Sequence, residues 1–106
     1  MAYKITVMPS AVADLDAHTR LIDKDSKAQA RKWLREAWDQ IFSLVTMPER
    51  FPVIHETTEI GSDVREVLHH SHRIIYRVKK SKRTVEILRV WHSPRRPLRA
   101  PDLPAE

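Results

Sequence analysis

The spacing of apolar residues changes along the chain, and this change limits the possible fold more than any other feature of the sequence. Residues 3–7 alternate apolar with polar side chains, which is the two-residue period of a strand with one buried face. Two longer stretches, at about residues 10–22 and 26–46, have the period of amphipathic helices. Three further strand-like runs follow, at residues 64–69, 73–79 and 84–91. This order predicts an α+β fold.

The two helices have recognisable ends. Ser10 is suited to cap the first helix, and Asp25 or Ser26 can cap the second. The second helix is expected to end before Pro48, because the residue ahead of a proline avoids the α region. The polar break between the helices is so short that they must fold back as an antiparallel hairpin, which covers one face of the sheet.

The second helix carries an apolar arc that is broader than one helix face needs. We expect Leu34 and Ile41 to be buried at the contact with the sheet. Trp33 and Trp38 flank this contact. Ordinary packing is one interpretation of these two tryptophans, and a partner interface is the other.

The middle strand-like run separates two kinds of side chain. Ile74, Tyr76 and Val78 share one face, whereas Arg73 and Arg77 share the other. If the apolar set packs on the helices, the arginines line the open face of the sheet. The last run is apolar on both faces, so its facing cannot be assigned from its period.

Residues 48–63 are predicted to form a loop in which three side chains pack on the core, those of Phe51, Val53 and Ile54. Four of the seven prolines of the chain follow residue 93. We therefore predict a single domain over residues 1–93 and an extended, mobile Pro/Arg-rich tail over residues 94–106.

Several classes of protein are excluded by what the chain lacks. It contains no cysteine, which excludes disulfides and thiolate sites and fits a reducing cytosol. Its one glycine, Gly61, excludes the glycine-rich loops that hold nucleotide phosphates. No signal peptide is visible, and no run approaches the roughly 20 apolar residues of a membrane span. We expect a soluble, cytoplasmic protein without a cofactor or a membrane partner.

Positive charge is concentrated in the second half of the chain. Up to Asp63 there are 8 Lys and Arg against 10 Asp and Glu, and from Val64 onward there are 11 against 4. Most of the later cations are arginines, whose planar guanidinium suits phosphate or carboxylate recognition. An anion-binding surface and a merely solvated basic face are both consistent with this pattern.

The densest set of candidate catalytic residues is Arg65, Arg73 and Arg77 with His92. Cleavage of RNA without a metal needs a base for the 2′-hydroxyl, a cation for the developing charge and an acid for the leaving oxygen. Arginines and a histidine can supply most of these functions. Structural or solvated roles are the alternative.

Two further groups of polar residues invite a chemical interpretation. His69, His70 and His72 lie together at a turn, but a zinc site needs further ligands that no motif or cysteine supplies, so no metal is predicted. The second group is His55, Glu56 and Glu59. Its carboxylates could serve acid–base catalysis, but residues of this kind are more common in an ordinary polar loop.

Several segments, in this order, resemble the RelE/ParE superfamily of bacterial type II toxins. They are Tyr3 to Val7, Pro9 to Leu15, Leu44 with Pro48 to Pro52, Val64 to Glu66, His72 to Val78, and Val85 to His92 with Arg95 and Arg96. The resemblance spans roughly residues 3–96. It implies an N-terminal strand and a helical hairpin packed on one face of a mainly antiparallel sheet, and a cognate antitoxin as the partner.

The superfamily has two functional branches. In ribosome-dependent mRNA endonucleases, positions matching Arg73 and His92 can serve catalysis, and Arg65 would join them in this chain. That branch often has an aromatic residue after the last strand or clustered lysines on the middle strands, whereas Ser93 follows His92 here. The long second helix and the segment 48–52 look more like the ParE branch, which inhibits DNA gyrase.

The resemblance therefore implies a toxin that is neutralised by an antitoxin and inhibits DNA gyrase. The contacts with target or antitoxin would come from basic and aromatic side chains, namely Arg77, Arg95, Arg96, Arg99, Trp33 and Trp38. An endonuclease that acts on mRNA at the ribosome and a non-toxic, partner-binding relic of the fold remain the alternatives.

Overall fold

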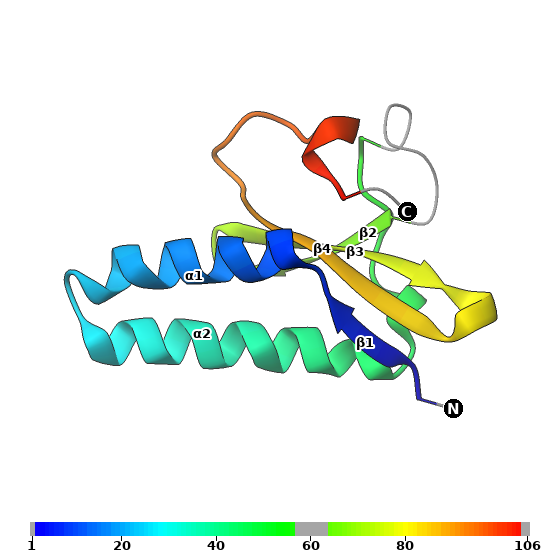
Figure 1. Ribbon diagram of the computed structural model, residues 1–106, viewed down its shortest axis with the longest axis horizontal. Helices are drawn as coiled ribbons and strands as arrows, with labels where there is room; N and C mark the ends of the chain where they lie inside the picture. Colours follow the sequence, from blue (N-terminus) through cyan, green and yellow to red (C-terminus); the bar gives the residue numbers. More distant parts are fainter. Residues whose placement is uncertain (1, 57–63, 105–106) are drawn as a thin grey trace.

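A computed structural model describes residues 2–56 and 64–104 of the chain. The regular elements follow the expected order (Figure 1): β1 (Lys4–Val7), α1 (Pro9–Asp23), α2 (Lys27–Phe42), β2 (Val64–His69), β3 (His72–Lys79) and β4 (Thr84–His92). Gly61 and Glu59, which the sequence analysis singled out, lie outside the described residues. The α+β class and the order of its elements are confirmed.

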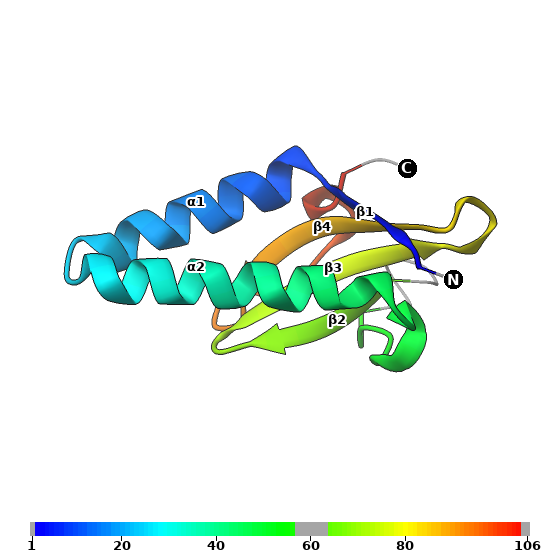
Figure 2. The same cartoon turned by 90° about the horizontal axis from the view of Figure 1, so that it is seen from below.

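One four-stranded sheet has the strand order β1-β4-β3-β2. β1 runs parallel to β4, and the other two pairs of neighbours are antiparallel. The helices α1 and α2 lie side by side and cover one face of this sheet (Figure 2). The mainly antiparallel sheet with a helical hairpin on one face is therefore confirmed.

The two helix starts differ from each other in how they are capped. Ser26 caps α2 as expected, since its side chain accepts a hydrogen bond from the backbone N–H of Gln29. The expected cap at Ser10 is wrong, because Pro9 occupies the first turn and Met8 is the N-cap residue. The hydroxyl of Ser10 instead donates to the carbonyl oxygen of Leu88 in β4, at 2.7 Å.

The main core lies between the helices and the sheet. Ile41 is fully buried there, whereas Leu34 is only partly buried at its edge. The expected burial of both residues is thus confirmed for Ile41 and only partial for Leu34. Ile74, Tyr76 and Val78 face the helices, as their alternation predicts.

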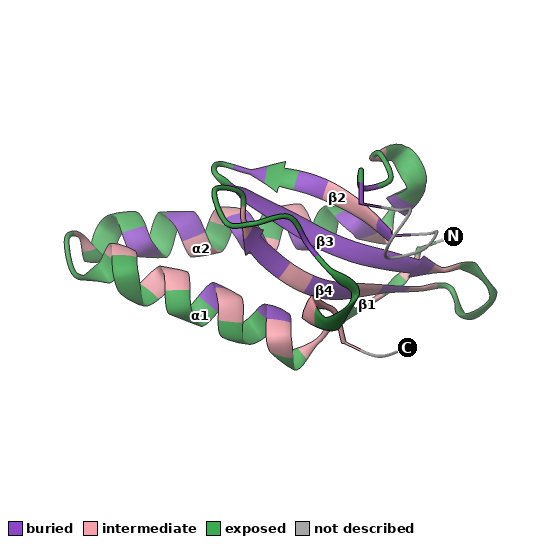
Figure 3. Cartoon of the chain, turned by 90° about the horizontal axis from the view of Figure 1, so that it is seen from above, coloured by how far each residue is buried: buried purple, intermediate pink, exposed green. Residues whose placement is uncertain are grey.

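A second apolar cluster covers the opposite face of the sheet. It contains Ile54, Val64, Ile75, Leu88, Trp91 and Leu98. Leu98 belongs to the Pro/Arg-rich segment, so the described part of this segment, residues 94–104, is not a free tail. Figure 3 shows it crossing the buried strands β3 and β4. Val53 does not join the core as expected and is 44% exposed.

A β-bulge settles the facing of β4. The pairing with β3 shifts between Ile75 and Tyr76, whose partners are Arg89 and Ile87, so Leu88 is the extra residue. Before the bulge, Ile87 packs on the helices, and after it Val90 does. The shift of one residue explains why the alternation of β4 could not be assigned from the sequence.

Candidate functional site

The predicted catalytic constellation does not form one site. Arg73 pairs with Trp91 in the sheet, on the face that the C-terminal segment covers. His92 pairs with His72 and faces the helices. Arg65 also faces the helices but lies opposite Tyr76, four residues further along β3. The expectation of one open arginine-rich face that also carries His92 is therefore wrong.

Arg73 is bound on its own face by two carboxylates. Its Nη1 and Nη2 donate to Glu56 at 2.9 and 2.7 Å, and its Nε donates to Glu66. Glu56 also accepts a hydrogen bond from the backbone N–H of Leu98 at 3.1 Å. Burial alone would raise the pKa of Glu56, but the bonds from Arg73 and Leu98 outweigh burial and lower it to about 2. The guanidinium of Arg73 is therefore engaged within the fold.

Arg77 and Arg65 are likewise held by neighbouring groups. Arg77 is buried, with its Nη1 3.6 Å from a carboxylate oxygen of Glu86. Arg65 donates to the backbone carbonyls of Glu49 and Phe51, at 3.1 and 2.7 Å. Arg65 thus fixes residues 49–51 to the sheet, whereas Arg77 pairs with Glu86 within the sheet.

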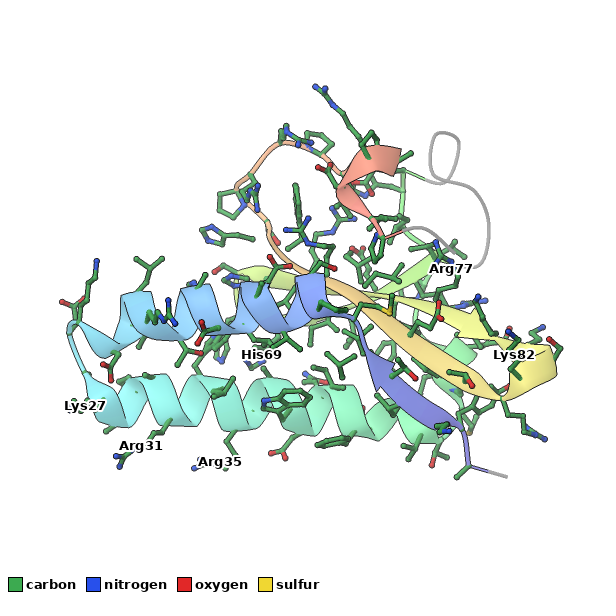
Figure 4. All side chains as sticks on the ribbon, in the orientation of Figure 1. Lys27, Arg31, Arg35, His69, Arg77 and Lys82 are labelled. Carbon is green, nitrogen blue, oxygen red and sulfur yellow. The ribbon has the colours of Figure 1, made fainter. Side chains whose placement is uncertain are left out.

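Four histidines and a tryptophan gather between the helices and the sheet, and we call them the histidine cluster: His18, Trp33, His69, His72 and His92. The ring of His72 lies 4.1 Å from that of His18 and stacks on that of His92 at 4.7 Å. Trp33 packs against His18, His69 and His72 at 4.6 to 5.2 Å. In Figure 4 the label of His69 falls between the ribbons of α1 and α2, and its ring packs on Trp33 of α2, whereas Arg77 lies over the sheet beyond the helices.

Burial favours the uncharged form of three histidines in this cluster, His18, His69 and His72. Burial, together with the neighbouring histidines, lowers the pKa of His72 to about 4. Burial lowers the pKa values of His18 and His69 as well. The Nε2 of His69 donates to the carbonyl oxygen of Trp33, at 3.1 Å. Neutral imidazoles are the form that such an apolar site favours.

Two of the turn histidines, His70 and His72, point in different directions. His72 is directed into the cluster, whereas His70 lies in the left-handed region at φ 55° and reaches Glu36 at 3.4 Å. Within residues 2–56 and 64–104, no group of three or more His, Asp or Glu side chains could hold a metal ion. His55 lies 3.4 Å from Glu56, and Glu59 falls outside the described residues.

Asp14 was missed by sequence reasoning as a site residue. Its carboxylate accepts hydrogen bonds from Nε and Nη2 of Arg89, at 2.7 and 2.8 Å, and from the backbone N–H of Val90, at 2.9 Å. These bonds join α1 to β4 beside the histidine cluster. Asp14 and Arg89 are 75 residues apart in sequence, and no local signal pairs them.

The arginines of the C-terminal segment surround Trp91. The guanidinium of Arg95 lies 4.1 Å from its ring centre, and its indole N–H donates to the carbonyl oxygen of Arg96 at 3.1 Å. Arg96 binds Asp102 through two hydrogen bonds of 2.8 Å, which lower the pKa of Asp102 to about 2. Arg95, Arg96 and Arg99 are all exposed.

The two tryptophans of α2 have different surroundings. Trp33 is buried in the histidine cluster, so it cannot touch a partner without a rearrangement. Trp38 stacks on Phe42 at 5.6 Å, and Phe42 is 55% exposed. The apolar surface open to a partner on this helix is therefore Trp38 with Phe42. No helix in the described part of the chain is long and apolar enough to cross a membrane.

Comparison with known proteins gives a consistent result. A family model described as the ParE toxin of the type II toxin–antitoxin system, parDE, matches residues 5–97. A structure of the chromosomal ParDE toxin–antitoxin system from P. aeruginosa is similar, with 19% identity, 86% of this chain and 96% of that chain covered, and a TM-score of 0.68.

A second similar structure is the RelBE2 toxin–antitoxin complex from Mycobacterium tuberculosis. It shares 21% identity over 87% of this chain and 99% of that chain, with a TM-score of 0.63. No curated protein sequence matches. At these identities, the similar structures establish the fold.

Proposed function

The chain belongs to the ParE toxin family of type II toxin–antitoxin systems, and from this premise we propose that it inhibits DNA gyrase in the cytoplasm and is neutralised by a cognate antitoxin. The observation that carries the choice of gyrase is the state of Arg73. Its donors are taken up by Glu56 and Glu66, and His92 lies on the other face of the sheet. This arrangement supports an inhibitor that acts by binding.

The exposed arginines of the C-terminal segment are the proposed contacts with the target. Arg95 and Arg99 present their charge to solvent on a segment that Leu98 anchors to the sheet. Anchoring reduces the entropy lost on binding. Arg77 is buried beside Glu86, so we assign it to the support of this face.

The antitoxin is proposed to cover the apolar pair Trp38 and Phe42 together with part of the basic half of the chain. An acidic, amphipathic segment that folds on binding fits both surfaces. The two similar structures are toxin–antitoxin systems by their titles, which supports a partner of this kind.

Expression in bacteria tests the proposal. The wild-type chain is expected to arrest growth and to relax a reporter plasmid, while the mRNA stays intact. The double variant Arg95→Gln/Arg99→Gln should need about tenfold more protein for the same arrest, because two interface cations are lost. The matched control Lys4→Gln/Lys82→Gln removes the same charge from exposed positions elsewhere and should behave as the wild type (Figure 4 labels Lys82).

If the chain is instead an endonuclease, we expect cut mRNA and a normally supercoiled plasmid. This alternative requires His92 as acid or base, so His92→Gln should lower ribosome-dependent mRNA cleavage by about 10² to 10⁴ in a folded protein. Growth arrest with cut mRNA and a normally supercoiled plasmid would replace the gyrase proposal by this one. Expression without any growth defect would leave the partner-binding relic.

A further inference from the structure

A pocket of about 180 Å³ opens beside the histidine cluster, between α1, the start of β3, the end of β4 and the start of the C-terminal segment. Three imidazoles and a guanidinium line it, those of His18, His72, His92 and Arg95. These side chains come from four different segments of the fold. Their meeting is therefore a product of the tertiary structure.

The imidazoles at this pocket have unused hydrogen-bonding capacity. Within the described residues, none of the rings of His18, His72 and His92 makes a hydrogen bond to another residue. The Nδ1 of His72 is also buried, in a side chain that is only 3% exposed. Buried polar atoms in folded proteins nearly always have a partner. An orphaned nitrogen here indicates a partner that the chain does not supply.

The charges around the pocket favour an anion as that partner. Asp14 also lines it, but its carboxylate is neutralised by Arg89 and accepts the N–H of Val90. Arg95 has no ion pair within the described residues, and its guanidinium lies over the ring of Trp91 at 4.1 Å from the ring centre. The pocket therefore holds one free cation.

The remaining neighbours of the histidines are already engaged. His69, from β2, is bonded to the carbonyl oxygen of Trp33, which is the α2 residue in the cluster. Glu36, also on α2, and His70, in the β2–β3 turn, pair with each other. Within the described residues, the three histidines of the pocket are the groups left without a hydrogen-bond partner.

We propose that this pocket is an oxyanion site that binds one phosphate group, from a nucleotide or from a nucleic-acid backbone. Imidazolium and guanidinium N–H groups are strong donors to phosphate oxygens. His18 and His92 are half-exposed, and their rings lie 4.1 and 4.7 Å from that of the buried His72, so an oxyanion that reaches them lies next to His72. The site shares Arg95 with the proposed contacts with gyrase, but its three histidines take no part in those contacts, so it stands whether the target is gyrase or mRNA.

Binding should be coupled to protonation. Burial lowers the pKa values of His18 and His72, so these rings are neutral at physiological pH. A bound oxyanion stabilises the charged form and raises these pKa values again. Phosphate binding therefore takes up protons and strengthens as the pH falls.

Nitrogen NMR of the imidazole rings tests the proposal on the full chain. The probes are inorganic sulfate, whose charge does not vary with pH in this range, inorganic phosphate and a short single-stranded oligonucleotide, with chloride at equal ionic strength as the reference. The rings of His18, His72 and His92 should shift toward the protonated form, while those of His55 and His70 should not. Sulfate should bind at least about tenfold more tightly near pH 6 than near pH 8.

Two pairs of variants separate the pocket from general charge effects. His18→Gln and Arg95→Gln should weaken sulfate binding by about tenfold or more, because each removes a charge-assisted hydrogen bond. The matched controls His70→Gln and Arg31→Gln should bind as the wild type does (Figure 4 labels Arg31). Both test positions are at least partly exposed, and circular dichroism checks the fold of each variant.

The outcomes are distinct. Tighter binding of the oligonucleotide than of inorganic phosphate assigns the site to a nucleic-acid backbone, and the reverse order assigns it to a free phosphate or nucleotide. The absence of a saturable shift with all three probes would overturn the proposal. Equal loss in the test variants and in the controls would overturn it as well.

Discussion

The carboxylate of Glu56 holds three separate parts of the chain together. It accepts two hydrogen bonds from Arg73 in β3 and one from the backbone N–H of Leu98 in the C-terminal segment. Its side chain is 6% exposed and that of Arg73 is 9% exposed. A buried ion pair of this kind contributes little to the net free energy of unfolding. The loss of one partner is nevertheless strongly destabilising, because the other charge stays buried without compensation.

Glu56→Gln is therefore expected to lower the free energy of unfolding by about 3 kcal/mol at neutral pH, because Arg73 keeps only Glu66 as an anionic partner. Urea unfolding followed by circular dichroism measures this change. The neighbouring His55→Gln is the control, since the His55 side chain is 72% exposed. A loss below about half a kcal/mol in Glu56→Gln, the range typical of surface changes, would contradict the assigned role.

The buried histidines predict how stability depends on pH. The pKa of His72 is about 4 in the folded chain, against 6.5 as its ordinary value. Well above pH 6.5, His72 is neutral in both the folded and the unfolded chain, so its protonation does not lower the free energy of unfolding. As the pH falls from 6.5 toward 4, the unfolded chain gains a proton that the folded chain does not, so stability is lost, by about 3 kcal/mol from His72 alone.

Unfolding free energies measured in urea from about pH 8 to about pH 4, in buffers without phosphate, test this dependence. His72→Gln should flatten the curve in that window, whereas His55→Gln should leave it unchanged. A stability that stays constant between pH 6.5 and 4 would show that His72 is not desolvated in the folded chain.

The described part of the C-terminal segment, residues 94–104, packs against the sheet. Leu98 is fully buried and packs with Trp91 and Leu88 on the face of the sheet away from the helices. Deletion of everything after Ser93 would expose this apolar face and remove a partner of Glu56. Truncation therefore tests folding before it tests function, and point variants of the exposed arginines are the better probes.

Leu98→Ala is expected to destabilise the protein by about 2 to 5 kcal/mol, because a fully buried leucine is reduced to a methyl group. It should also release the segment, so that trypsin cuts at its arginines faster than in the wild type. Leu21→Ala, at a site that is 57% exposed on α1, is the matched control and should change neither property. Equal trypsin resistance of Leu98→Ala and the wild type would mean that the segment is held in another way.

Sequence patterns predicted the helices and strands because each of these elements depends on the spacing of apolar residues within its own segment. The alternation around Tyr76 and the arc around Ile41 appear in the structure on the faces that their periods predict. The arrangement of the site was not predictable in this way. The bulge at Leu88 turns His92 toward the helices, and the partners of Arg73 and Arg89 come from segments remote in sequence. Such contacts depend on tertiary packing, which a period does not encode.

Considered as a whole molecule, the chain presents two surfaces that suit an acidic, amphipathic antitoxin. One is the exposed apolar pair Trp38 and Phe42, and the other is the basic second half of the chain. Binding should give a negative heat capacity change, since apolar surface is removed from water, and the antitoxin should gain helical structure. Calorimetry over a range of temperatures and circular dichroism of the mixture measure both effects. An antitoxin that binds without gaining structure would contradict coupled folding.

We propose that this member of the ParE toxin family acts on DNA gyrase, and a supercoiling assay with purified components is the decisive test. The purified chain is titrated into gyrase with relaxed plasmid and, in parallel, into a translating ribosome system with labelled mRNA. We predict a dose-dependent loss of supercoiling at concentrations that leave the mRNA intact. Unimpaired supercoiling together with ribosome-dependent cuts in the mRNA would contradict the account.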